Sequence, residues 1–317
     1  MRILIAGGFG FVGGRLGQYL HQAGHQITLG SRDSGNPPNW FSCAKVVKTD
    51  WNDTNALEQA CDGVDIVIQA AGLNAQDCTN DPVAALEING LATARLVESA
   101  ARADVKRFIY LSTAHVYASP LAGKISEESY TRNLHPYATS HIAGENAVLG
   151  ANQRKEIEGL VLRLSNVFGA PAHKDVNCWM LLVNDLCKQA VQTRQLVLRS
   201  SGLQKRDFIA MADVCRAVEH LSICTYSSNV INIGSGVSQS VIQMAQFIQQ
   251  RCLVLLGYKP TLEFPTFGGS ENAEMLEYQI DRLIELGLGL AVEWDLEVDR
   301  LLTFCQASFF EANSANQ

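Results

Sequence analysis

Tyr137 and His141 lie one helical turn apart in the stretch HPYATSHIAGE, residues 135–145. Residues four apart share a face of a helix, so the phenol and the imidazole can act on one ligand. A free tyrosine titrates near 10, so its use as a base at pH 7 requires lowering its pKa by about 3 units, or roughly 4 kcal/mol. A fixed cation could supply much of that energy. Histidine is a poor cation at pH 7, because only about a quarter of its molecules are charged and burial reduces that fraction.

The weakness of His141 as a cation affects the two directions of proton transfer differently. A tyrosine that protonates a carbonyl oxygen during reduction already carries its proton at neutral pH, whereas oxidation requires the phenolate. The pair of Tyr137 and His141 therefore favours a reaction in which Tyr137 donates a proton.

A glycine-rich turn precedes the first predicted helix, in ILIAGGFGFVGGRL. The spacing satisfies both GxxGxxG and GxGxxG, and it follows an apolar strand and opens an amphipathic helix. Glycine allows the backbone to turn sharply beside a pyrophosphate, whose charge is bound by free amides at the helix N-terminus. The turn predicts dinucleotide binding, tight packing being the alternative, and the residues concerned are Gly7, Gly8, Gly10, Phe11, Val12 and Gly13.

The end of the second predicted strand, QITLGSRDSG, indicates which dinucleotide binds. An acidic residue there would accept a hydrogen bond from a ribose 2′-hydroxyl, but Ser31 and Arg32 occupy the position. Arginine offers bidentate donors and no acceptor, which suits a 2′-phosphate, so NADP is favoured over NAD. Asp33 keeps NAD open as an alternative. At the end of the third strand, Asp50 and Trp51 are expected beside the adenine, although Asp50 could instead cap the helix that follows.

The elements that must position these residues are read from the hydrophobic pattern. Short apolar runs alternate with helical segments through the first two thirds of the chain, which is typical of a parallel sheet covered on both faces. The rhythm then changes to helices near 178–191, from Asp213 and from Ser238 to Leu256, with a strand near 196–199. We expect an α/β fold: a doubly wound Rossmann sheet over 1–168, to which 205–235 return, and a smaller mixed α/β substrate domain over 169–317.

The composition of the chain limits the kinds of partner that it can bind. The chain has 317 residues and a net charge of -7 with both signs interleaved, so it has no basic stripe to bind nucleic acid. Its nine cysteines are scattered without metal-ligand spacing, which indicates free thiols in a reducing compartment and no metal site. No run is apolar over about 18 residues, and the first strand begins at residue 2. We therefore expect a cytoplasmic protein without a membrane span.

Taken together, these motifs resemble the extended short-chain dehydrogenase/reductase family, above all its nucleotide-sugar epimerases, dehydratases and ketoreductases. The segments that carry the resemblance follow family order along nearly the whole chain: the glycine turn, VDIVIQAAGLNA, EINGLATARLVESA, LSTAHVYA, YATSH, RLSNVFGA, LQKRDFIAMADV and NVINIGSG. The resemblance implies that Thr113 and Tyr137 are catalytic and that a lysine should follow four residues after the tyrosine. This chain has His141 there, which we expect to bond the nicotinamide ribose in place of the lysine.

The resemblance also implies further contacts. It places Ser31 at the adenosine ribose, in agreement with NADP, and it places Asn89 at the site. A basic residue that many relatives carry is missing from TFGGSENAEMLE, residues 266–277, which weakens the case for a nucleotide sugar. The implied dinucleotide contacts include Ala70, Ala71 and Gly72, and the implied substrate contacts are Asn74, Thr113, Ala114, His115, Asn166 and Arg206.

We therefore expect a one-way enzyme that reduces a keto group on a nucleotide sugar, taking hydride from NADPH and a proton from Tyr137. The favoured substrates are 4-keto-6-deoxy sugars. The alternatives are an NAD-dependent nucleotide-sugar 4-epimerase and a non-catalytic protein that senses NADP(H). Dehydration is disfavoured, because relatives that dehydrate carry an acidic pair where this chain has Ala114 and His115. Small and apolar residues on several faces of the segments 82–102 and 137–150 predict a homodimer.

Overall fold

The computed structural model describes residues 1–33, 35–264, 274–289 and 293–309. Its centre is a seven-stranded sheet in the order β11-β7-β5-β4-β1-β2-β3, with every neighbouring pair parallel. The predicted strands are confirmed. They are β1 (Arg2–Ala6), β2 (Gln26–Ser31), β3 (Lys45–Lys48), β4 (Ile66–Gln69), β5 (Arg107–Thr113), β7 (Glu158–Leu164) and β11 (Val230–Ile233).

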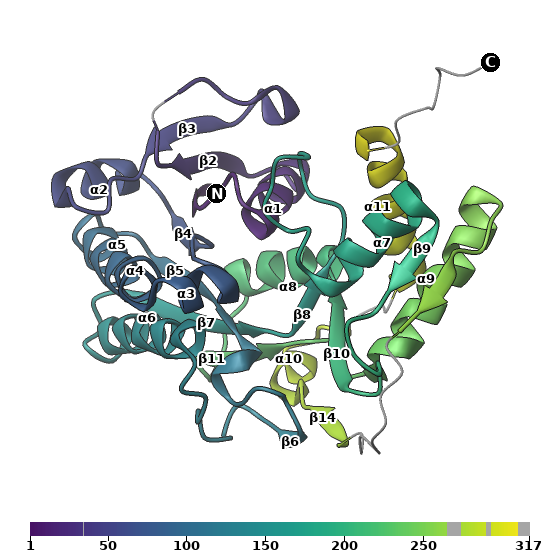
Figure 1. Cartoon of the computed structure of the whole chain (residues 1–317). Helices are drawn as coiled ribbons and strands as arrows, with labels where there is room; N and C mark the ends of the chain where they lie inside the picture. The colour runs from purple at the N-terminus through teal and green to yellow at the C-terminus, as the bar shows by residue number, and fades with distance from the viewer. Residues whose placement is uncertain (34, 265–273, 290–292, 310–317) are drawn as a thin grey trace.

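Helices cover both faces of this sheet, as the continuous apolar runs require. Side chains alternate along β1, so Ile3 and Ile5 pack with α1 and α8, while Leu4 and Ala6 pack with α2, α5 and α6. Figure 1 shows α5 and α6 together at the left of the sheet. The bounds are α1 (Phe11–Gln22), α2 (Thr54–Cys61), α5 (Ala92–Arg102), α6 (Pro136–Gln153) and α8 (Met211–Ile223).

The strand order reverses between β1 and β4, because the chain passes outward through β2 and β3 before returning. In open parallel sheets, ligands bind in the crevice that such a reversal leaves at the carboxyl ends of the strands. The glycine turn follows β1 and the segment 70–72 follows β4, so the fold brings both to this crevice.

A smaller unit lies beside the sheet, to the right in Figure 1. One sheet has the order β12-β10-β8 and another pairs β13 with β9, and α7, α9 and α11 pack on them around a second core that includes Phe168 and Trp294. Between β10 and β12, the chain returns to the large sheet and contributes α8 and β11 to it. The bounds are β8 (Asn166–Phe168), β9 (Gln195–Val197), β10 (Lys205–Ala210), β12 (Ser238–Ser240), β13 (Thr261–Glu263), α7 (Leu182–Thr193), α9 (Val241–Leu256) and α11 (Trp294–Phe309).

The remaining elements are short. A π-helix spans Leu86–Leu91 and leads into α5, and β6 pairs in parallel with β14 at the lower edge of Figure 1. In the described ranges, no helix is both long and apolar enough to cross a membrane. The other bounds are α3 (Ala75–Asn80), α4 (Pro82–Ala85), β6 (Gly123–Ile125), β14 (Leu276–Tyr278), α10 (Asp281–Glu285) and two 3₁₀ turns, Asn39–Phe41 and Ala114–Val116.

Two helices begin later than predicted. The helix expected from 178 begins at Leu182, because Leu181 takes an extended backbone and the Trp179 indole donates to the Lys174 carbonyl 3.1 Å away. The helix expected from Ser238 begins at Val241, because Ser240 caps it in a reciprocal capping box with Gln243.

Candidate active site

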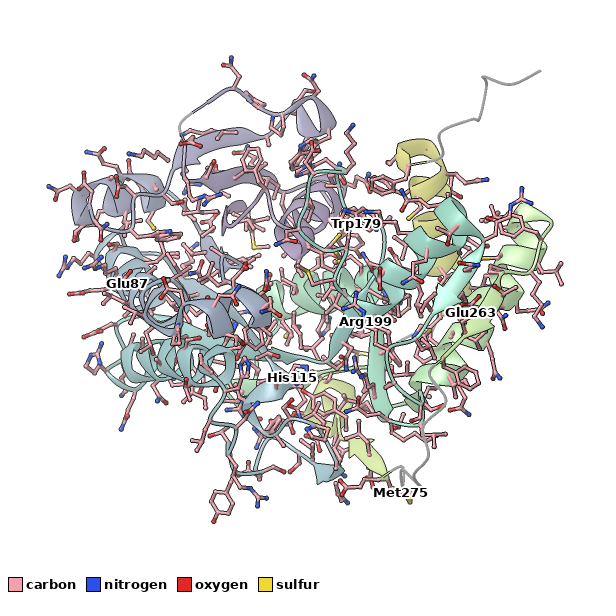
Figure 2. The ribbon with its side chains drawn as sticks, in the orientation of Figure 1. Glu87, His115, Trp179, Arg199, Glu263 and Met275 are labelled. Atoms are coloured by element: carbon pink, nitrogen blue, oxygen red, sulfur yellow. The ribbon has the colours of Figure 1, made fainter. Side chains whose placement is uncertain are left out.

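A cavity of about 650 Å³ lies between the carboxyl ends of the strands and the smaller unit. Both parts of the fold line it, and Figure 2 labels one lining residue, His115, near the centre of the molecule. The predicted site residues that line the cavity are Gly10, Phe11, Val12, Arg32, Ala70, Ala71, Gly72, Asn74, Thr113, His115, Tyr137, His141, Asn166 and Arg206.

The glycine turn fits a dinucleotide diphosphate. Gly7 has a φ of +78°, and a Cβ there would lie 2.5 Å from the Ala71 nitrogen, so the turn after β1 directly contacts the loop after β4. A Cβ at Gly13 would lie 2.3 Å from the Gly7 carbonyl oxygen. Helix α1 begins at Phe11 with no side-chain cap from Gly10 and no acid in its first turn, so its N-terminus suits an anion. Gly7 and Gly13 thus shape the turn without lining the cavity.

The residues predicted to contact the adenosine have different environments. Arg32 lines the cavity, whereas the Ser31 hydroxyl accepts from the Asp33 amide at 3.3 Å. Asp50 is bonded to Lys48 at 2.9 Å, and that hydrogen bond is the main reason that its pKa is lowered. The alternative that Asp50 caps α2 is wrong, because Asp53 is the cap and accepts from the Ala56 amide at 3.1 Å.

Two further predicted residues lie outside the cavity wall. The Trp51 side chain packs against the core shared by α2 and α5. Ala114 is buried in the other core, at the start of the 3₁₀ turn after β5.

The phenol and the imidazole meet as the spacing predicts. Helix α6 begins at Pro136, and the His135 ring caps it by accepting from the Tyr137 amide at 3.1 Å. The rings of Tyr137 and His141 pack edge to face, with centroids 4.6 Å apart. Thr113 ends β5 beside them and hydrogen-bonds Tyr137.

Burial opposes charge on both groups. It raises the pKa of Tyr137, and the Thr113 bond offsets this only in part. His141 is 6% exposed, and burial, with a smaller contribution from His115, lowers its pKa to about 4. At neutral pH the phenol therefore keeps its proton and the imidazole is neutral.

No lysine in the described part of the cavity wall replaces the missing cation. Among the described residues that line the cavity, Arg32 and Arg206 are the only arginines, and no lysine is present. Arg206 lies on β10 and donates to the Gln204 side chain at 3.0 Å, and burial lowers its pKa. Burial, followed by the charge of Arg206, also lowers the pKa of His115.

The predicted asparagines have different environments. Asn89 is fully buried outside the cavity wall, where it accepts from the Leu73 amide at 2.8 Å and donates to the Ser140 hydroxyl at 3.0 Å. It thereby ties the loop after β4 to α6. Asn74 bonds Asp77 through both its side-chain oxygen and its nitrogen, so it caps α3.

Sequence reasoning missed one wall of the cavity. This wall belongs to the segment between β8 and α7, where the sequence carries no spacing signal that points to a site. Its lining residues are Asp175, Val176, Asn177, Met180 and Leu181.

A doubly wound parallel sheet, with a glycine turn and an uncapped helix N-terminus at its switch point, defines the class of dinucleotide-binding α/β enzymes. The chain belongs to the NAD dependent epimerase/dehydratase family, whose model matches residues 3–234. This confirms the resemblance to extended short-chain dehydrogenases/reductases, and the chain is an enzyme of that type.

Relatives that are named for different reactions have similar sequence identity to this chain. A Methanocaldococcus jannaschii protein assigned as a UDP-glucose 4-epimerase is 28% identical over 78% of this chain and 81% of its own. A dTDP-6-deoxy-L-talose 4-dehydrogenase (NAD(P)(+)) from Kitasatospora kifunensis is also 28% identical, over 78% of each chain. The solved structure of MoeE5 in complex with UDP-glucose and NAD superposes with a TM-score of 0.80 at 24% identity, covering 97% of this chain and 99% of that one.

Proposed function

We propose that this enzyme uses NADPH to reduce a keto group on a nucleotide-activated sugar, with Tyr137 as the proton donor. The favoured substrates are 4-keto-6-deoxy sugars. The observation that carries the proposal is the buried, neutral His141 against the Tyr137 ring. It leaves the phenol without a cation that would stabilise the phenolate. Proton donation is thus available at neutral pH, while proton removal is costly.

Each residue of the cavity wall named here has one role in the proposed reaction. The amides after Gly10 bind the dinucleotide diphosphate, Arg32 binds the 2′-phosphate, and the bound nicotinamide supplies the hydride. The Tyr137 hydroxyl gives its proton to the carbonyl oxygen, which Thr113 holds with a hydrogen bond. Asn166 and Arg206, on the opposite wall, bind the nucleotide sugar.

The relatives support the reaction class to different degrees. The Kitasatospora relative is named for redox chemistry at position 4 of a 6-deoxy sugar nucleotide, which is the chemistry proposed here. Other relatives are named as 4-epimerases, and several neighbours were solved with NAD. An NAD-dependent epimerase is therefore the second candidate, but it must remove and return a proton in each turnover, which the raised pKa of Tyr137 opposes.

The direct test is turnover with defined substrates. With dTDP-4-keto-6-deoxyglucose, we expect oxidation of NADPH at 340 nm and a reduced 6-deoxyhexose by NMR. UDP-glucose and UDP-galactose should not interconvert. Their interconversion without net consumption of the dinucleotide would replace the proposal with the epimerase. Tight NADPH binding with neither reaction would favour the sensor.

The choice of NADPH can be tested at Arg32. We expect Arg32→Ala to weaken NADPH binding about tenfold or more and to leave NADH binding unchanged, because only NADPH presents a phosphate to the guanidinium. Arg2→Ala is the control, since it removes the same charge at the amino end of β1, outside the cavity wall, where Arg2 pairs with Asp65. Fluorescence titration measures both affinities. Equal weakening of NADPH and NADH would assign Arg32 no part in the choice.

We also propose that the enzyme is a cytoplasmic homodimer. Val83, Leu86 and Leu91 expose large apolar side chains along the segment that leads into α5, which suits a bundle with the same helices of a second copy. The nine cysteines are unpaired, in keeping with a reducing compartment.

A further inference from the structure

The side of His141 that faces away from the cavity contacts a tyrosine from the central sheet. The Tyr110 hydroxyl lies 2.8 Å from His141 Nδ1 and 3.3 Å from the Asn89 carbonyl oxygen. Tyr110 is on β5 and is 1% exposed. His141 Nε2 has no hydrogen-bond partner among the described residues, while the His141 side chain lines the cavity.

Neighbouring groups decide which way the Tyr110 proton points. The Asn89 carbonyl already accepts from the Thr93 hydroxyl at 2.8 Å, and Gln69 donates to that hydroxyl at 3.1 Å, which leaves the Thr93 proton for Asn89. Asn89 therefore does not need the Tyr110 proton. A phenol is a better donor than acceptor, and the imidazole nitrogen is the nearer of the two acceptors. We therefore assign the Tyr110 hydroxyl as the donor and His141 Nδ1 as the acceptor.

A neutral imidazole carries one proton, so a donor bonded to Nδ1 places the ring N–H on Nε2. Helix α6 is adapted to this contact at Gly144, three residues after His141. A Cβ at Gly144 would lie 2.7 Å from the Tyr110 hydroxyl and 2.6 Å from the Asn89 carbonyl oxygen. The glycine gives the phenol the room it needs.

We propose that Tyr110 is a positioning residue that holds His141 in the Nε2–H tautomer, so that a single N–H donor faces the cavity. His141 then offers a ribose hydroxyl the hydrogen bond expected of the family lysine, without its charge. The identity of that acceptor rests on the proposed function. The assignment of the tautomer depends only on the contacts of Tyr110.

The tautomer can be measured without dinucleotide or substrate. In the full chain labelled with ¹⁵N-histidine, long-range ¹H–¹⁵N correlations distinguish Nδ1–H from Nε2–H, and comparison with His141→Gln assigns the signal among the seven histidines. We expect Nε2–H for His141 in the wild type and a mixture or reversal in Tyr110→Phe. The matched control is Tyr117→Phe, which removes another buried hydroxyl, bonded to Asn232 at 2.7 Å, and should leave the tautomer unchanged. An Nδ1–H signal in the wild type would overturn the proposal.

A double-mutant cycle separates positioning from general structural support. Tyr110→Phe should weaken NADPH binding about fivefold when residue 141 is histidine, the effect of one hydrogen bond. It should have no such effect in a His141→Lys background, because lysine has a single nitrogen and so has no tautomer for the phenol to select. Equal weakening in both backgrounds would show that Tyr110 only supports the fold. Absence of dinucleotide binding combined with an Nε2–H tautomer would refute the proposed function and leave the assignment of Tyr110 standing.

Discussion

Replacement of Tyr137 by phenylalanine is expected to lower kcat for reduction by about 10²–10⁴-fold, the range that a positioned general acid contributes. The change removes the donor proton and keeps the ring, so packing against His141 is retained. Affinity for NADPH should therefore change little. Steady-state rates with a keto-sugar nucleotide and a separate NADPH titration give the two quantities.

The control for this substitution is Tyr130→Phe. Tyr130 lies in the segment before α6 and is 82% exposed, so loss of its hydroxyl should leave kcat unchanged. If Tyr137→Phe turned over at the wild-type rate, the proton would come from another group or from water, and the proposed mechanism would be wrong.

Replacement of His141 by lysine should raise the oxidative rate far more than the reductive rate. An ammonium beside Tyr137 stabilises the phenolate, and each unit by which the pKa of Tyr137 falls multiplies the phenolate fraction at pH 7 by ten. A fall of about 3 units gives a gain of up to about 10³-fold in oxidation. Reduction uses the phenol that is already present, so its rate should change by less than about threefold. Stopped-flow hydride transfer in both directions measures the two rates.

His141→Gln is the matched variant for this comparison, because its amide can donate a hydrogen bond but carries no charge. It should leave the oxidative rate low, so a gain in His141→Lys alone would be due to the charge. If the lysine increased oxidation and reduction equally, the directional role of His141 would be refuted.

The sheet was predictable from the chain because its signals are local. Each strand is a short apolar run, since helices bury both of its faces, and Gly7 and Gly13 mark the turn at its switch point. The spacing of Tyr137 and His141 on one helix was likewise sufficient to place their rings together. Local spacing failed at Asp50 and Asp53, where two acids before one helix compete for the same cap.

The amino-acid sequence was enough to establish the class of fold, the glycine turn and the absence of a lysine four residues after Tyr137. All three depend on neighbours along the chain. The packing of the elements was needed to show how strongly burial suppresses charge on His141, that the segment after β8 forms one wall of the cavity, and that Tyr110 bonds the imidazole. These contacts join distant parts of the chain: Tyr110 and His141 are 31 residues apart, and they meet because α6 packs on β5. Hydrophobic spacing predicts each element, but not which polar atoms become neighbours when two elements pack.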